Sequence, residues 1–291
     1  MDSETLKNFL VVAREGNITR AAQFIHITQP TLSRQLQNLE REMGRPLLSR
    51  GKRHISLTPE GVLFCKRAGE ILELFRKTRS EVQSSAEFGG DIYFGAGETD
   101  VIRRIAQVAS QFAQIHPGVR YHVRSGDADA VREMLEKGLV DFGLVYGPSD
   151  PVKYRSVELA PVDHWGILLP RTHPLAACAA LTPEQVRDLP LILSKQALDT
   201  GLLQEWLGRS LDMLHVAATY TLLTNAAKMV AGGLGCAMGL DGLINTAGTE
   251  ICFRPCNPPL PAGMSLIWKK GQLFTPAVQG FLDELVKNFK K

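Results

Sequence analysis

Hydrophobic residues near the start of the chain predict two short helices. Leu6, Phe9 and Val12 recur at the spacing of an amphipathic helix. A second helix is expected over 18–26, because Ala21 and its neighbouring alanine give it a packing side with small residues. Small side chains at that position allow another helix to approach closely.

A third helix is predicted to begin at Thr28, which can cap it, with Pro30 in the first turn where no amide donor is needed. Leu32, Leu36 and Leu39 then point inward at spacings of four and three. The polar side of its leading end carries Thr28, Gln29, Pro30, Thr31, Ser33, Arg34 and Gln37. Two helices joined by a tight turn, the second with a polar leading end, predict a helix-turn-helix whose second helix enters the DNA major groove. A capped surface helix with a solvated polar face is the alternative for this segment alone.

A basic stretch follows the third helix. Arg50, Lys52 and Arg53 surround a glycine, and residues 54–57 alternate like a short strand. A basic hairpin beside a recognition helix is suited to contact phosphates or an adjacent minor groove. We therefore expect a winged helix-turn-helix.

Residues 59–88 predict one long helix, about 45 Å in length at ~1.5 Å per residue. Apolar residues repeat along it at spacings of four and three, as in a coiled coil. This stripe contains Phe64, Ala68, Ile71, Phe75, Thr78 and Val82. We expect a partner helix to cover Phe64, Ala68, Ile71, Phe75 and Val82 of this stripe. Packing against the following domain of the same chain is the alternative.

The segment from residue 6 to residue 61 resembles a known family. It contains NITRAAQFIHITQPTLSRQLQNLEREMGRPLLSR followed by LTPEG, and strongly resembles the winged helix-turn-helix of LysR-type transcriptional regulators. The paired alanines, the Q-x-x-L-S-R core, the G-x-x-L step and LTPEG carry the likeness. It implies base or phosphate contacts for Gln29, Pro30, Thr31, Ser33 and Arg34, and a minor-groove contact for Arg53. These residue types suit base edges and the thymine methyl group.

Beyond residue 90 strands and helices alternate in two series. Strands are expected over 91–96, 119–125 and 140–146, and a second series begins at 165. Alternation of this kind predicts an α/β fold with mostly parallel strands in two subdomains. It resembles the effector-binding domain of the same family, which is like a periplasmic binding protein.

The expected organisation has three parts. Residues 1–58 form the all-α winged helix-turn-helix, and residues 59–90 form the linker and dimerisation helix with a hinge. Residues 91–291 form the effector-binding domain, with subdomain I over 91–161 plus 266–291 and subdomain II over 162–265.

Ligands in open α/β sheets bind beyond the carboxyl ends of the strands, near helix N-termini. That rule selects a set of effector-binding residues: Thr99, Ser125, Gly126, Tyr146, Ser194, Lys195 and Thr221. The resemblance implies that Thr99, Ser125 and Ser194 turn hydroxyls toward an effector. Alternatively, each hydroxyl caps its own helix. Small anions are the usual expectation, but Glu98 and Asp100 oppose one unless they turn to solvent, and otherwise favour a neutral or amino-bearing effector.

The distribution of charge agrees with an N-terminal nucleic-acid-binding domain followed by a nearly neutral domain. The first 58 residues hold nine Lys/Arg and five Asp/Glu, a net +4, whereas residues 91–291 hold 19 and 20, a net −1. Five scattered cysteines fit reduced thiols. The chain shows neither a basic leader nor an apolar run of the roughly 20 residues that a membrane span needs.

The sequence therefore predicts a cytoplasmic, sequence-specific DNA-binding regulator, an activator or a repressor, controlled by a small effector. The resemblance implies a homodimer that pairs into a homotetramer, and contact with RNA polymerase. We expect no cofactor, no metal site, no membrane contact and no catalysis, since no nucleophile–base, P-loop or zincin motif is found. Two alternatives stay open: a thiol-based redox sensor using Cys252 and Cys256, and an α/β enzyme with a DNA-binding appendage.

Overall fold

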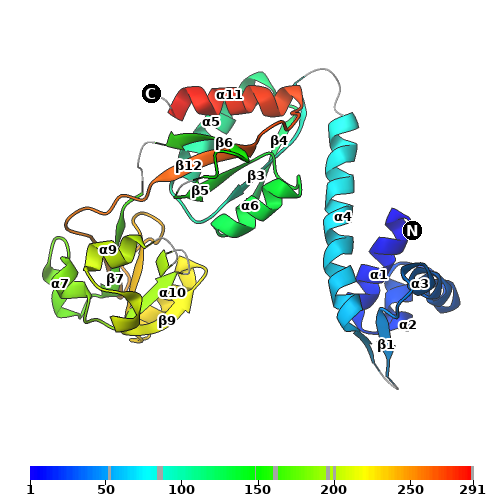
Figure 1. Ribbon diagram of the computed structural model, residues 1–291, viewed down its shortest axis with the longest axis horizontal. Helices are drawn as coiled ribbons and strands as arrows, with labels where there is room; N and C mark the ends of the chain where they lie inside the picture. Colours follow the sequence, from blue (N-terminus) through cyan, green and yellow to red (C-terminus); the bar gives the residue numbers. More distant parts are fainter. Residues whose placement is uncertain are drawn as a thin grey trace. The chain divides into compact units, whose positions relative to one another are not determined.

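The computed structural model describes residues 1–51, 54–83, 88–147, 149–159, 163–194, 197–198 and 201–289. The chain divides into two compact units, 1–83 and 84–291, each of which is described by itself (Figure 1). Within the described ranges, every helix falls short of the length or the apolarity needed to cross a bilayer.

The first unit begins with three helices, α1 (Ser3–Glu15), α2 (Ile18–Phe24) and α3 (Gln29–Met43). Asp2, Asn17 and Thr28 precede them, and each side chain accepts a hydrogen bond from the backbone N–H three residues on. These caps satisfy amides that have no partner inside the helix. The predicted helices and the Thr28 cap are confirmed.

A two-stranded hairpin follows α3. Strand β1 (Leu48–Arg50) pairs antiparallel with β2 (Ile55–Leu57), which confirms the predicted hairpin. Lys52 and Arg53 lie outside the described residues, and so does the side chain of Arg50.

Helix α4 (Pro59–Gln83) starts directly after the hairpin. The Thr58 hydroxyl accepts from the Gly61 amide at 2.9 Å and donates to the Pro46 carbonyl at 2.8 Å. A Cβ on Gly61 would lie 1.9 Å from the carbonyl oxygen of Leu47. The glycine of LTPEG is therefore required for α4 to approach the start of the hairpin.

The apolar stripe of α4 is divided between two environments. Ala68 is fully buried against Leu6 and Leu72, and Phe64 packs edge-to-face on Phe9 with ring centroids 5.0 Å apart. The second half of the stripe is exposed, with Ile71 at 45%, Phe75 at 53% and Val82 at 79%.

Ala68 was expected to contact a partner helix, but α1 already covers it, whereas Phe64 stays partly exposed. Helix α1 has 13 residues and α4 has 25, about 20 and 37 Å at ~1.5 Å per residue. The first three helices therefore reach only part of the way along α4 (Figure 1).

The second unit contains two five-stranded sheets. The first has the strand order β4 (Val119–Ser125), β3 (Gly90–Ala96), β5 (Phe142–Tyr146), β12 (Met264–Lys269) and β6 (Tyr154–Leu159). Its apolar side is covered by α5 (Val101–Ile115) and α11 (Pro276–Phe289), and α6 (Ala128–Glu136) covers the other (Figure 1).

The second sheet has the order β11 (Ile251–Pro255), β7 (Trp165–Pro170), β10 (Cys236–Leu240), β8 (Leu191–Ser194) and β9 (Val216–Tyr220). Helix α10 (Leu223–Ala231) packs on one face. On the other lie α7 (Pro183–Val186) and α9 (Leu202–Leu207), with the short 3-10 turns η1 (Pro174–Ala177) and η2 (Leu211–Met213) in the connecting segments.

The two α/β subdomains are confirmed, but the expectation of mostly parallel strands is not. In the described part of the chain each sheet has two parallel and two antiparallel strand pairs. Antiparallel pairs arise where the chain returns, since β12 runs back between β5 and β6. Strand β12 begins at Met264, which pairs with Tyr146 on one side and Leu159 on the other.

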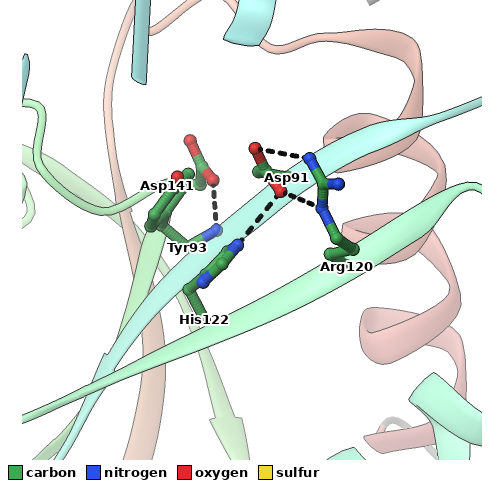
Figure 2. A network of polar contacts seen from close by, with 5 residues as sticks. All are labelled: Asp91, Tyr93, Arg120, His122 and Asp141. Carbon is green, nitrogen blue, oxygen red and sulfur yellow. Dashed lines mark hydrogen bonds and ion pairs between the residues drawn. The ribbon is translucent and has the colours of Figure 1, made fainter. Parts of the chain in front are cut away.

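A polar network joins β3 to its neighbours in the first sheet (Figure 2). The Asp91 carboxylate accepts from Arg120 Nε at 2.8 Å and lies 3.0 Å from His122 Nε2. The Tyr93 amide donates to Asp141 Oδ2 at 2.8 Å, and the Tyr93 ring stacks on His122. These contacts tie β3 to β4 and to the start of β5, in the half of the sheet where the three strands begin.

Two alanine substitutions in α4 test the packing at its start. Gly61→Ala is expected to lower the free energy of unfolding by at least about 2 kcal/mol, because the new Cβ meets a backbone carbonyl. Gly69→Ala, in the same helix with nothing within 4 Å of its Cβ, is expected to raise it by about 0.5–1 kcal/mol. Urea unfolding followed by circular dichroism measures both, and equal effects would contradict the assigned contact.

Candidate functional site

The leading end of α3 presents a continuous polar surface. Leu32, Leu36 and Leu39 are buried in the core of the first unit. Six of the seven predicted DNA-contacting residues of α3 are exposed on the opposite side: Thr28, Gln29, Pro30, Thr31, Arg34 and Gln37. The seventh, Ser33, is half-buried. The structure therefore brings all seven together on one face.

Side chains on this surface are ordered by short contacts along the helix. Gln29 Nε2 donates to Ser33 Oγ at 2.9 Å, and the hydroxyls of Thr28 and Thr31 lie 2.8 Å apart. Arg34 forms no hydrogen bond or ion pair with the described residues. The surface thus offers a free guanidinium beside a preordered amide and hydroxyls, the groups that read base edges in a major groove.

The hairpin is fastened to α3 by Glu40, a residue that the sequence reasoning missed. Glu40 Oε1 accepts from the amides of Leu47 at 2.8 Å and Leu48 at 2.9 Å. On the other side the Ile55 amide donates to the carbonyl of Gly16 at 2.9 Å. The only sequence signal was an acidic residue adjacent to the buried Leu39, near the inner face of the helix.

A cleft of about 770 Å³ opens between the two sheets of the second unit, a volume typical of small-molecule sites. Its walls come from the carboxyl ends of β3, β4, β5, β8 and β9 and from the first turns of the helices that follow β3, β4 and β9. Six of the predicted effector-binding residues line it: Thr99, Ser125, Gly126, Tyr146, Ser194 and Thr221. Lys195 lies outside the described residues.

A buried carboxylate lies behind two residues of the cleft lining, Thr99 and Tyr146. Asp163, at 1% exposure, accepts from the Thr99 hydroxyl at 2.5 Å, the Tyr146 hydroxyl at 2.7 Å and the Asp100 amide at 3.1 Å. Burial, and then the adjacent Asp163 charge, raise the pKa of Tyr146 well above its ordinary value. Tyr146 therefore stays protonated and donates to Asp163 at any physiological pH.

Some hydroxyl groups in the cleft form hydrogen bonds within the chain, and others are available to a ligand. Thr99 donates to Asp163 and accepts from the Val101 amide at 3.0 Å, so its hydroxyl already has two partners within the chain. The Ser194 hydroxyl accepts from the Ala197 amide at 3.1 Å and also forms a hydrogen bond with the Tyr220 phenol. Ser125 and Thr221 are exposed in the cleft and form no side-chain hydrogen bond with the described residues.

The two carboxylates that opposed an anionic effector are both engaged. Glu98 Oε2 accepts from the Leu223 amide at 2.6 Å. This hydrogen bond crosses the cleft, because Glu98 lies on the side of the first sheet and Leu223 begins α10 on the side of the second. Asp100 pairs with Arg103 at 2.9 Å. Glu98 is a second residue whose role the sequence reasoning left open, because its partner is 125 residues further along the chain.

The cysteine pair considered for redox sensing is buried in the second sheet's core. Cys252 and Cys256 have exposures of 2% and 3%, and burial raises the pKa of the Cys256 thiol to about 12. Reactive thiols have lowered pKa values and solvent access. This environment disfavours the thiol-based alternative.

Comparison with known families now identifies the class. The family model described as LysR substrate binding domain matches residues 85–290, and the model described as bacterial regulatory helix-turn-helix protein, lysR family, matches residues 3–62. The chain belongs to the LysR family. It is a DNA-binding transcriptional regulator with a helix-turn-helix head and a substrate-binding domain.

Individual relatives agree over nearly the whole chain. The Hca operon transcriptional activator HcaR of Escherichia coli (strain K12) is 26% identical over 289 residues, covering 97% of this chain and 96% of that protein. The crystal structure of CbnR, a LysR family transcriptional regulator, matches with a TM-score of 0.82 at 21% identity over all of both chains. Full-length CbnR complexed with its target DNA matches with a TM-score of 0.79 at 22% identity, covering 99% of this chain and all of that one.

Glu40→Ala tests how the hairpin is positioned. Two backbone amides lose their acceptor, so the free energy of unfolding of the first unit is expected to fall by about 1–3 kcal/mol, and DNA affinity with it. Glu42→Ala is the matched control: it removes an exposed pair with the chain's amino terminus and is expected to change stability by less than about 1 kcal/mol. Thermal unfolding and fluorescence anisotropy on one DNA fragment measure the two effects. Equal behaviour of both variants would refute the role of Glu40.

Proposed function

We propose that this regulator reads its operator with the leading end of α3 and responds to a small effector in the cleft of the second unit. The observation that carries the proposal is the gathering of ligand-facing groups at two places: the face formed by seven residues at the start of α3, six of them exposed, and, in the cleft, the open hydroxyls of Ser125 and Thr221. The first place offers hydrogen-bonding groups for base edges, and the second offers hydroxyl groups for a small molecule.

At the DNA, α3 supplies base contacts and the hairpin supplies phosphate contacts. Arg34 has the donor fork that suits guanine, and Gln29 has the amide that suits adenine. Pro30 and Thr31 offer apolar atoms to a thymine methyl group. Arg50, Lys52 and Arg53 contribute charge to positioning, which depends on salt but not on base sequence.

Pairing of two chains follows from the exposed half of α4. Ile71, Phe75 and Val82 repeat at spacings of four and seven on a helix that extends past its own head. A second copy of α4 would cover them, whereas Ala68, which is buried within its own unit, would take no part. A homodimer of this kind presents two heads to two half-sites, and a homotetramer would add two more.

In the cleft, binding is coupled to the arrangement of the two sheets. An effector between them shifts their arrangement only if it binds one arrangement more tightly than another. The regulator then acts in the cytoplasm as an activator or a repressor without a cofactor and without catalysis. Contact with RNA polymerase stays an expectation from the family.

Alanine at Arg34 or Ser33 tests the reading role of α3. Each variant is expected to bind the preferred operator about 5- to 100-fold more weakly, since a good base contact is worth about 1–3 kcal/mol, while affinity for random DNA changes little. Gel-shift titration against both DNAs gives the ratio, and Arg41→Ala, on the last turn of α3, is the control. Equal losses on the two DNAs would show that these residues do not read sequence.

A further inference from the structure

Glu98 makes a direct hydrogen bond from one wall of the cleft to the other. Its carboxylate leaves the loop between β3 and α5 and accepts from the Leu223 amide, the first residue of α10, at 2.6 Å. Leu222, at the cap position of α10, provides no side-chain cap. Glu98 therefore caps a helix of the opposite sheet.

Helix N-termini are the places where a cleft of this kind would hold an anion. In the described part of the chain, α5, α6 and α10 begin at this cleft, and the start of each is already occupied by an acceptor from the chain itself. Asp163 accepts from the start of α5, Asp127 accepts from the Ala130 amide of α6 at 2.9 Å, and Glu98 accepts from the start of α10.

The remaining lining reinforces this electrostatic bias. Among the described residues that line the cleft, Glu98 and Asp127 carry charge and both are acidic, while Ile102, Val123, Trp165 and other apolar side chains form much of the wall. The Glu98 charge lies close enough to Tyr220 to contribute, after burial, to raising the pKa of that phenol. A carboxylate-bearing ligand would meet like charge here.

We propose that Glu98 is the specificity-determining residue of the cleft: it takes the position that an anionic effector would occupy and selects an effector with an apolar body and an amino group. This inference rests on the proposed binding of an effector in the cleft. One Glu98 oxygen holds the Leu223 amide, and the other is directed to the ligand's ammonium group, with the hydroxyls of Ser125 and Thr221 as further partners.

Three probes that share one ring and differ in their polar group test the selection. Benzylamine, benzamide and benzoate are titrated calorimetrically into the full-length protein. The wild type is expected to bind benzylamine at millimolar concentration and at least tenfold more tightly than benzoate, with benzamide between them. Absence of benzylamine binding, or a preference for benzoate, would overturn the proposal.

Glu98→Gln separates charge from geometry, because its amide oxygen can still accept from Leu223. This variant is expected to lose the preference, with the ratio of benzylamine to benzoate affinity falling at least tenfold. Asp129→Asn is the matched control, since it removes the same charge from the exposed first turn of α6, outside the cleft lining. If the ratio of benzylamine to benzoate affinity is unchanged in Glu98→Gln, or changes equally in both variants, Glu98 does not determine the specificity of the cleft.

A third variant distinguishes this inference from the proposed function on which it rests. Ser125→Trp places a large ring into the cleft and is expected to abolish benzylamine binding. If binding persists in Ser125→Trp, the ligand lies elsewhere, and both the cleft and the inference fail. If Ser125→Trp abolishes binding but Glu98→Gln leaves the ratio unchanged, the cleft stands and the selection by Glu98 is wrong.

Discussion

The geometry of the cleft depends on one buried carboxylate, Asp163. A buried charge without a partner is strongly unfavourable, and no cation pairs with Asp163 in the described part of the chain. Two hydroxyls and one helix-terminal amide stabilise it instead, and the positive end of the α5 dipole adds to them. Because Asp163 belongs to the segment that leads from the first sheet into β7, these three bonds fix where the chain crosses between the sheets.

The other features of the cleft follow from that anchor. Thr99 and Tyr146 give their protons to Asp163, which leaves Ser125 and Thr221 as the open hydroxyls among the described residues of the lining. Across the opening, the Glu98 bond to Leu223 brings the two walls together without a covalent link. One buried anchor behind the cleft lining and one hydrogen bond between the two walls are a suitable arrangement for sheets that shift when a ligand enters.

Local patterns predicted the head well and the strand ends of the body nearly as well. The α3 cap, its inward leucines and its polar face all depend on residues within four positions, and parallel strand ends must meet at one edge of a sheet. Strand β6 was missed because Arg155 and Glu158 interrupt its apolar pattern. The roles of Asp163, Glu98 and Glu40 were also missed, because each depends on a partner chosen by the tertiary fold. For α4 the stripe was identified correctly, but the span that α1 covers was not.

Hydrogen exchange at the Asp100 amide tests the central role of Asp163 most directly. In the wild type this amide donates to Asp163 Oδ1 and is expected to be protected. In Asp163→Ala its protection is expected to fall at least tenfold, about 1.4 kcal/mol of local opening free energy, with amides of β8 unchanged. Exchange at Asp100 that is the same in both proteins would contradict the account.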